Sequence, residues 1–177
     1  ATVDLLGVEC WVSRSGYTGE DGYEISVPAS HAQALAQALL DMPDVEAIGL
    51  GARDSLRLEG GLCLYGNDID ATTSPVEAGL NWAIQKVRRP DGARSGGSAR
   101  ILGDFQNGVA RKRVGLVPDG RAPMRAGTEI FADADGGAAI GIVTSGGFGP
   151  SVGGPVAMGY VQTDFATIDT PLFGDVR

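Results

Sequence analysis

The alternation of hydrophobic and polar residues predicts two strands near the beginning of the chain. Residues 8–12 are a short, mostly apolar run of β-formers, and residues 23–27 alternate between apolar and polar. The second strand would therefore turn its aromatic and aliphatic side chains to one face and Glu24 to the other. The polar segment 15–22 between them is rich in glycine and has the composition of a loop.

A first helix is predicted over residues 31–41. The segment is rich in Ala, Leu and Gln, and its leucines recur at a helical spacing. Ser30 and Gln33 before it have the pattern of a capping box. His31, the single histidine of the chain, falls in the first turn of this helix and is expected to be a surface residue.

A second helix is predicted over residues 51–59. Gly60 and Gly61 follow its last apolar position and provide the stop signal. Arg53 and Arg57 are one helical turn apart, so the pattern places both on the same face.

Shorter elements follow the second helix. Ser74 and Glu77 form another capping box, with Pro75 in the first helical position. Residues 80–84 alternate again and predict a strand. We expect residues 89–110 to be a linker. One stretch of this segment contains Pro and Gly, and another is rich in Gly and Ser.

The last part of the chain has the pattern of a small β-domain. Short apolar runs bounded by Gly, Pro or Asp predict strands at residues 114–117, 128–132, 139–144 and 156–161. Evenly spaced short strands are typical of a barrel or sandwich. The glycine-rich segment 145–151 lacks the Gly-Lys-Ser/Thr ending of a phosphate loop, so we interpret it as a tight hairpin. The basic cluster 111–113 is interpreted as a solvated rim.

Charge and composition exclude several classes of protein. The net charge is −8, which disfavours binding to nucleic acid. No apolar run approaches the roughly 20 residues of a membrane span. Residues 1–90 carry a net charge of −7 and residues 91–177 only −1, which indicates two units. With the strands and helices above, the expected fold class is α+β.

Few residues are available for metal or nucleophilic chemistry. Cys10 and Cys63 lie far apart without a Cys-x-x-Cys pattern, so we expect two reduced thiols and no metal site. A single histidine excludes a Ser-His-Asp set, and no Gly-x-Gly-x-x-Gly fingerprint is present. Glu24 stands out because its side chain is expected to project from the non-core face of a strand, beside a loop that carries Tyr17.

Several short motifs together resemble the glycine cleavage T-protein family of aminomethyltransferases. They occur in family order at residues 15–25, 49–59, 65–70, 73–80, 111–116, 123–127, 141–146 and 156–161. The resemblance implies an antiparallel sheet with helices, belonging to the folate-binding domain, over residues 1–88. It implies a C-terminal β-barrel over residues 111–177, after the linker at 89–110.

The resemblance also implies a reaction. The family takes an aminomethyl group from the lipoyl arm of the H-protein, releases ammonia and converts tetrahydrofolate to 5,10-methylenetetrahydrofolate. Three residues fall on the family's folate-binding positions, namely Glu24, Arg53 and Tyr17. A carboxylate can accept two adjacent pterin N–H groups, a guanidinium suits a folate carboxylate or carbonyl, and a phenol ring can pack on the pterin.

The chain is shorter than the members of this family, and the resemblance implies that the N-terminal half is missing. The aspartate that orients or activates the folate nitrogen would lie in that half, so we expect no catalytic residue in this chain and no turnover by the chain alone. The family implies tetrahydrofolate as co-substrate, no metal, and the lipoylated H-protein as partner.

Three other interpretations stay open. One is the folate-binding half of a dimethylglycine or sarcosine dehydrogenase-type demethylase, and another is a non-catalytic folate-binding relative of the iron–sulfur assembly type. The signature Lys-Gly-Cys-Tyr-x-Gly-Gln-Glu of the latter is absent. The third is a module that binds a protein partner. No targeting segment is visible, so we expect a bacterial cytoplasmic location, or a mitochondrial one if the source is eukaryotic.

Overall fold

The structure of the protein is a computed structural model that describes residues 1–89 and 96–176. The chain divides into two compact units, Ala1–Leu62 and Cys63–Arg177. Both contain antiparallel strands and at least one helix, so the predicted α+β class is confirmed. Within the described residues no helix has the length and apolar character needed to cross a bilayer.

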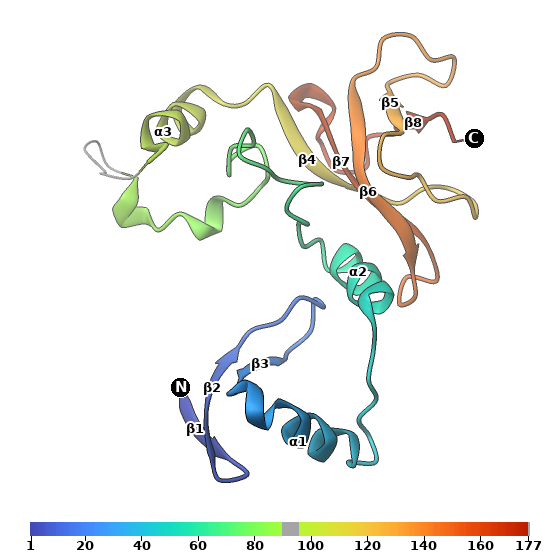
Figure 1. Ribbon diagram of the computed structural model, residues 1–177. Helices are drawn as coiled ribbons and strands as arrows, with labels where there is room; N and C mark the ends of the chain where they lie inside the picture. The colour runs from blue at the N-terminus through green and yellow to red at the C-terminus, as the bar shows by residue number, and fades with distance from the viewer. Residues whose placement is uncertain (90–95, 177) are drawn as a thin grey trace. The chain divides into compact units, whose positions relative to one another are not determined.

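The first unit contains a three-stranded antiparallel sheet and two helices (Figure 1). The elements are β1 (Thr2–Leu5), β2 (Val8–Arg14), β3 (Tyr23–Ser26), α1 (Ala29–Leu40) and α2 (Leu50–Glu59), with sheet order β1-β2-β3. The register sets Val3 opposite Cys10 and Val12 opposite Ile25, so these apolar side chains share one face, on which Cys10 is fully buried. The two predicted strands and both predicted helices are confirmed.

The second unit is built around a five-stranded antiparallel sheet of order β4-β7-β6-β5-β8. Its strands are β4 (Arg111–Leu116), β5 (Glu129–Phe131), β6 (Gly141–Gly149), β7 (Gly154–Gln162) and β8 (Phe173–Gly174). Its helical elements are η1 (Asn81–Ala83), η2 (Lys86–Arg88), α3 (Ser98–Asn107) and η3 (Thr163–Phe165).

The core of the second unit lies on the sheet. Ile130, Val143, Ala157 and Val161 form its buried cluster, and all four come from β5, β6 and β7. Short apolar runs bounded by Gly, Pro or Asp had predicted these three strands, and the structure confirms them. The glycine-rich segment does form the β6–β7 hairpin, although β6 continues through it as far as Gly149 before the chain turns.

The structure differs from the expected local structure at three places. Residues 80–84 form the short 3-10 helix η1 instead of a strand. The expected linker 89–110 contains the helix α3, while residues 90–95 of it lie outside the described residues. Ser30 and Gln33 do not build a capping box, since no described side chain caps α1 and the Ser30 hydroxyl instead lies 3.0 Å from Nδ1 of His31.

The second capping box forms, but around a turn. The backbone N–H of Ser74 donates to Oε2 of Glu77 at 2.8 Å, and the backbone N–H of Val76 donates to the Ser74 hydroxyl oxygen at 3.2 Å. The chain then continues into the 3-10 helix η1. The capping box therefore closes a single turn and does not begin an α-helix. The domain boundaries expected at residues 88 and 111 differ from the division into compact units and stay a prediction.

Candidate functional site

The loop between β2 and β3 is closed at its base by polar contacts. The hydroxyl of Ser15 donates to Oε2 of Glu24 at 2.5 Å, and Glu24 lies opposite Ser13 in the strand register. Arg14 and Asp21, near the two ends of the loop, form an ion pair. The position of the Glu24 carboxylate is therefore tied to the loop through Ser15.

Glu24 is exposed and keeps capacity to bind a ligand. An ionised carboxylate has about four lone-pair sites, and the hydrogen bond from Ser15 uses one of them. A ligand with two neighbouring N–H donors is therefore a suitable partner for this side chain. The bond from Ser15 also limits the rotation of the carboxylate, which reduces the entropy lost when a ligand binds.

Tyr17 and Arg53 are brought together by the fold. The guanidinium carbon of Arg53, on the first turns of α2, lies 4.9 Å from the centroid of the Tyr17 ring. Tyr17 is half-buried, whereas Arg53 is exposed. A cation–π contact does not use the N–H hydrogen bonds of a guanidinium, so Arg53 can still donate to a carboxylate or carbonyl.

The second arginine of α2 has a different role. Arg57 is 2% exposed, and its Nε donates to Oδ1 of Asp54 at 2.8 Å while Nη1 donates to the backbone oxygen of Leu62 at 3.3 Å. The sequence pattern placed Arg53 and Arg57 on one face, but it could not distinguish the exposed residue from the buried one. Arg57 therefore stabilises the end of α2.

The remaining candidates for chemistry occupy structural positions. His31 is exposed at the start of α1, as expected. Cys10 is buried and Cys63 is half-buried, and neither forms a disulfide. Among residues 1–89 and 96–176, no group of three or more His, Cys, Asp or Glu side chains is placed to hold a metal ion.

Asp68 is a buried polar centre that the sequence did not reveal. Its Oδ2 accepts hydrogen bonds from the backbone N–H of Leu64 at 2.8 Å and from the Ser145 hydroxyl at 2.9 Å. Its Oδ1 accepts from the Thr144 hydroxyl at 2.5 Å. The side chain is 1% exposed, so this carboxylate fastens the segment after Cys63 to β6.

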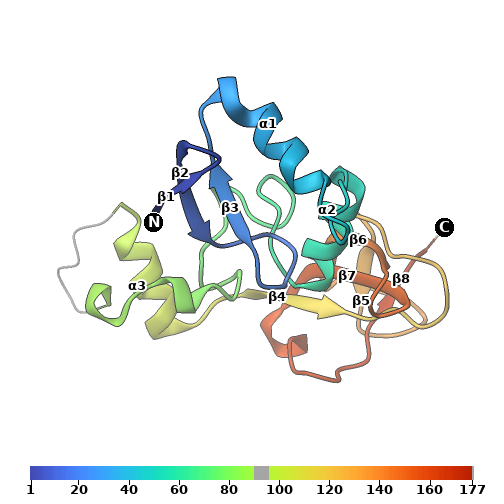
Figure 2. The same cartoon turned by 90° about the horizontal axis from the view of Figure 1, so that it is seen from below.

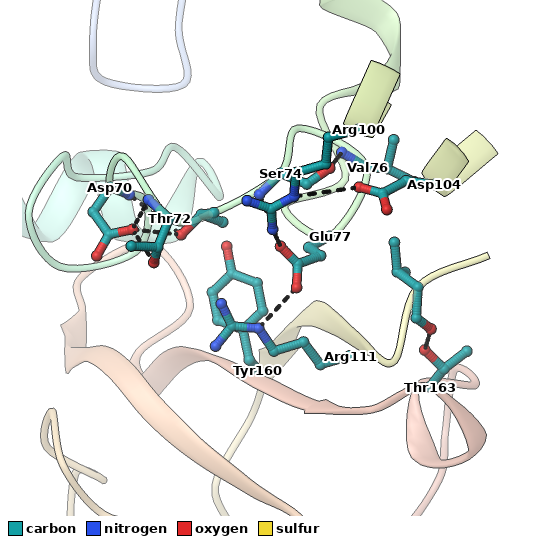
Figure 3. A network of polar contacts seen from close by, with 12 residues as sticks. Asp70, Thr72, Ser74, Val76, Glu77, Arg100, Asp104, Arg111, Tyr160 and Thr163 are labelled. Carbon is teal, nitrogen blue, oxygen red and sulfur yellow. Dashed lines mark hydrogen bonds and ion pairs between the residues drawn. The ribbon is translucent and has the colours of Figure 1, made fainter. Parts of the chain in front are cut away.

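A second polar network surrounds Glu77, whose side chain is 12% exposed (Figure 3). Its Oε2 lies 3.0 Å from Nη2 of Arg100 on α3, and its Oε1 lies 3.1 Å from Nε of Arg111 on β4. Arg113 also turns inward and donates to the backbone oxygen of Ala78 at 2.8 Å. Arg111 and Lys112 of the basic cluster are exposed, as expected for a solvated rim, whereas Arg113 is half-buried and makes structural contacts.

Tyr160 connects the two networks. Its hydroxyl donates to the backbone oxygen of Asp68 at 2.7 Å, and the guanidinium of Arg111 lies 4.7 Å from its ring centroid. Burial raises the pKa of Tyr160 to about 12, so the phenol keeps its proton and its donor role well into the alkaline range.

The second unit also contains a cavity of about 860 Å³ along β4 and the segment 165–173. Its lining is mixed, with Arg113 and Asp119 beside the apolar side chains of Met124, Ile130 and Leu172. None of the predicted folate-binding residues is among its described lining residues.

Two family models match the sequence. Residues 1–88 match the GCVT N-terminal domain, and residues 111–177 match the glycine cleavage T-protein C-terminal barrel domain.

Individual relatives support the same assignment. The mitochondrial aminomethyltransferase of Canis lupus familiaris is 50% identical over 178 residues, covering 100% of this chain and 43% of that protein. The mitochondrial aminomethyltransferase of Pisum sativum is 49% identical over 163 residues, covering 91% of this chain and 39% of that protein. The chain thus spans less than half the length of these relatives.

A solved structure shows the same fold. The glycine cleavage system aminomethyltransferase T from Bartonella henselae matches with a TM-score of 0.88 and 52% sequence identity, covering 94% of this chain and 45% of that chain. Since both family models match in sequence order and the fold agrees with this structure, the chain belongs to the glycine cleavage T-protein family.

Proposed function

We propose that this chain is part of an aminomethyltransferase of the glycine cleavage system that binds tetrahydrofolate as co-substrate. The observation that carries the proposal is the packing of Arg53 on Tyr17 in the unit that also holds the Glu24 carboxylate beside the same loop. The relatives at about 50% identity are named aminomethyltransferases, which supports a transferase over the demethylase alternative.

Each of the three side chains has a separate task in this proposal. Glu24 accepts hydrogen bonds from adjacent N–H groups of the pterin, Arg53 donates to a carbonyl or carboxylate of the folate, and Tyr17 packs against the ring. They bind and orient the folate so that one of its nitrogens faces the incoming one-carbon unit. None of them is assigned a proton-transfer step.

The reaction would transfer the aminomethyl carbon from the lipoyl sulfur of the H-protein to tetrahydrofolate. The carbon–sulfur bond breaks and leaves the dihydrolipoyl thiol, ammonia departs, and two folate nitrogens bond the carbon to give 5,10-methylenetetrahydrofolate. The lipoylated H-protein is the proposed partner, and neither nucleic acid nor a membrane has a part.

The proposed domain organisation keeps the boundaries expected from the sequence. Residues 1–88 belong to the folate-binding domain, 89–110 connect, and 111–177 form the C-terminal barrel, in line with the ranges of the two family matches. We propose a mitochondrial location if the source is eukaryotic, as in the names of the dog and pea relatives, and a cytoplasmic one if it is bacterial.

Exchange of Glu24 for glutamine should weaken tetrahydrofolate binding by about tenfold to a hundredfold. A hydrogen bond to a charged group contributes about 1.5–3 kcal/mol, and the amide replaces one acceptor oxygen by a donor. The measurement is a titration of the complete gene product with tetrahydrofolate, followed by tryptophan fluorescence.

Glu20→Gln is the matched control, because Glu20 is an exposed acid of the same loop and loses the same charge. Its affinity should stay within about twofold of the original protein. Equal affinity of the original protein and of Glu24→Gln would remove Glu24 from the proposed site.

We expect no steady turnover from the 177-residue chain on its own. The test supplies aminomethylated H-protein and tetrahydrofolate to the chain and to the complete gene product, and follows methylenetetrahydrofolate and ammonia. Turnover by the complete gene product, together with no turnover by the shorter chain, supports the proposal. Turnover by the 177-residue chain would show that its own residues complete the catalytic site.

A further inference from the structure

The loop 15–22 touches α2 at two places. Tyr17 packs on Arg53 near the beginning of the helix, and Gly19 meets Gly60 directly after its end. Both views show the loop between β2 and β3 extending to α2 (Figures 1 and 2). Arg53 and Gly60 are seven residues apart in sequence, which is about two turns, so both lie on one side of the helix.

The contact at Gly60 leaves no room for a side chain. A Cβ at this position would lie 2.9 Å from Cα and 3.2 Å from the backbone nitrogen of Gly19. Nonbonded carbon atoms prefer about 3.5–4.0 Å, so the loop would have to retreat by roughly 0.6–1.1 Å. The reverse contact is equally close, since a Cβ on Gly19 would lie 3.0 Å from Cα of Gly60.

Backbone conformation does not explain the glycine at position 60. Its φ is −69°, an ordinary helical value that alanine adopts readily. The left-handed residue that ends the helix is Gly61, with φ of +67°. Gly61 N–H donates to the oxygen of Leu58 at 3.1 Å and Leu62 N–H to that of Arg57 at 2.8 Å, the pattern of a Schellman motif. The two glycines therefore have separate roles. Gly61 provides the left-handed conformation, and the close approach of Gly19 is the reason for a glycine at position 60.

We infer that Gly60 is a positioning residue for the folate site: its missing side chain lets the loop seat on α2, and this seating holds Tyr17 against Arg53. The consequence for folate rests on the proposed function, whereas the consequence for the loop does not. The Gly19–Gly60 contact sets how closely the loop approaches the helix, and Tyr17 is only two residues away from it.

Gly60→Ala tests the seating of the loop, with Gly51→Ala as control. Gly51 lies in the same helix, and a Cβ there meets no described atom within 4 Å. In amide NMR spectra of the complete gene product, Gly60→Ala should shift the signals of residues 15–22, whereas Gly51→Ala should shift only its neighbours in α2. Unchanged loop signals in Gly60→Ala would overturn the inference, whether or not the protein binds folate.

The second measurement is the affinity for tetrahydrofolate in a double-mutant cycle. Gly60→Ala should weaken binding by about tenfold or more, because displacements near 1 Å at a binding site have effects of this size. In a Tyr17→Ala background the same exchange should have less than about a twofold effect, because the group that it misplaces is already gone. Equal losses in both backgrounds would show that Gly60 acts only on general stability. A complete gene product that binds no tetrahydrofolate would contradict the proposed function and leave the NMR result as the test of the seating.

Discussion

Replacement of Asp68 by alanine should lower the free energy of unfolding by about 3–5 kcal/mol. The carboxylate accepts from one backbone N–H and two hydroxyls while its side chain is 1% exposed. Alanine removes all three acceptor contacts and leaves the N–H of Leu64 and the Ser145 hydroxyl without this partner in a buried place. Urea denaturation followed by circular dichroism measures the loss.

Asparagine at position 68 should be tolerated better than alanine. Its amide oxygen can occupy the Oδ2 position and accept from Leu64 and Ser145, while its NH₂ group faces Thr144. The Thr144 hydroxyl can then accept from the amide and keep its own donation to the backbone oxygen of Met158, 3.3 Å away. We expect a loss of about 1–2 kcal/mol for this exchange. Asn67→Ala, at an exposed position of the same turn, should change stability by less than about 0.5 kcal/mol, and a similar small value for Asp68→Ala would contradict the assignment.

Gly146→Ala should destabilise the protein by about 3 kcal/mol or more, at the upper end of the effects of overpacking. Gly146 lies in β6, and a Cβ there would be only 1.7 Å from the backbone oxygen of Met124 and 3.3 Å from Cβ of Ala157. The first of these neighbours is backbone, so no side-chain rotation relieves the overlap. The sheet or the segment of Met124 has to move.

Gly115→Ala is the control for this second prediction. Gly115 is also a strand glycine, on β4, but a Cβ there meets no described atom within 4 Å. This exchange should be neutral or slightly stabilising, because alanine loses less conformational entropy on folding. Equal urea midpoints for the two variants would contradict the role assigned to Gly146.

Local chemistry was sufficient to predict the loop that carries the candidate site. Glycines and polar residues between two alternating runs indicated the loop 15–22, and the resulting order of strand, loop and strand is confirmed. The alternation also placed Glu24 on the face of β3 that lies opposite to its apolar side chains. It could not predict that Ser15 binds the carboxylate, because that contact depends on the register of β2 and β3. Nor could it predict that Arg53 packs on Tyr17, because that contact depends on how the loop reaches α2.

The incorrect predictions have physical causes. Three alternating apolar residues are too few to separate a strand from a 3-10 turn, and η1 is held by Arg89, whose side chain donates to the backbone oxygens of Asn81 and Ile84. The helix α3 did have a signal, since Ile101 and Phe105 are four residues apart, but the glycines before it obscured the pattern.

Asp68 could not have been found from the sequence at all. Its hydroxyl partners Thr144 and Ser145 are 76 and 77 residues away along the chain. They meet the carboxylate only when the register of β6 is formed and a bulge between Val143 and Ser145 alters the alternation of side chains. A buried carboxylate of this kind is recognised from its surroundings, which the local pattern does not contain.

The most direct test of the proposed folate site is a crystal structure of the complete gene product with tetrahydrofolate bound. We expect N–H groups of the pterin to lie within hydrogen-bonding distance of the Glu24 carboxylate, and we expect Arg53 and Tyr17 both to touch the folate. A folate molecule bound without contact to these three residues, for example in the cavity along β4, would contradict this expectation.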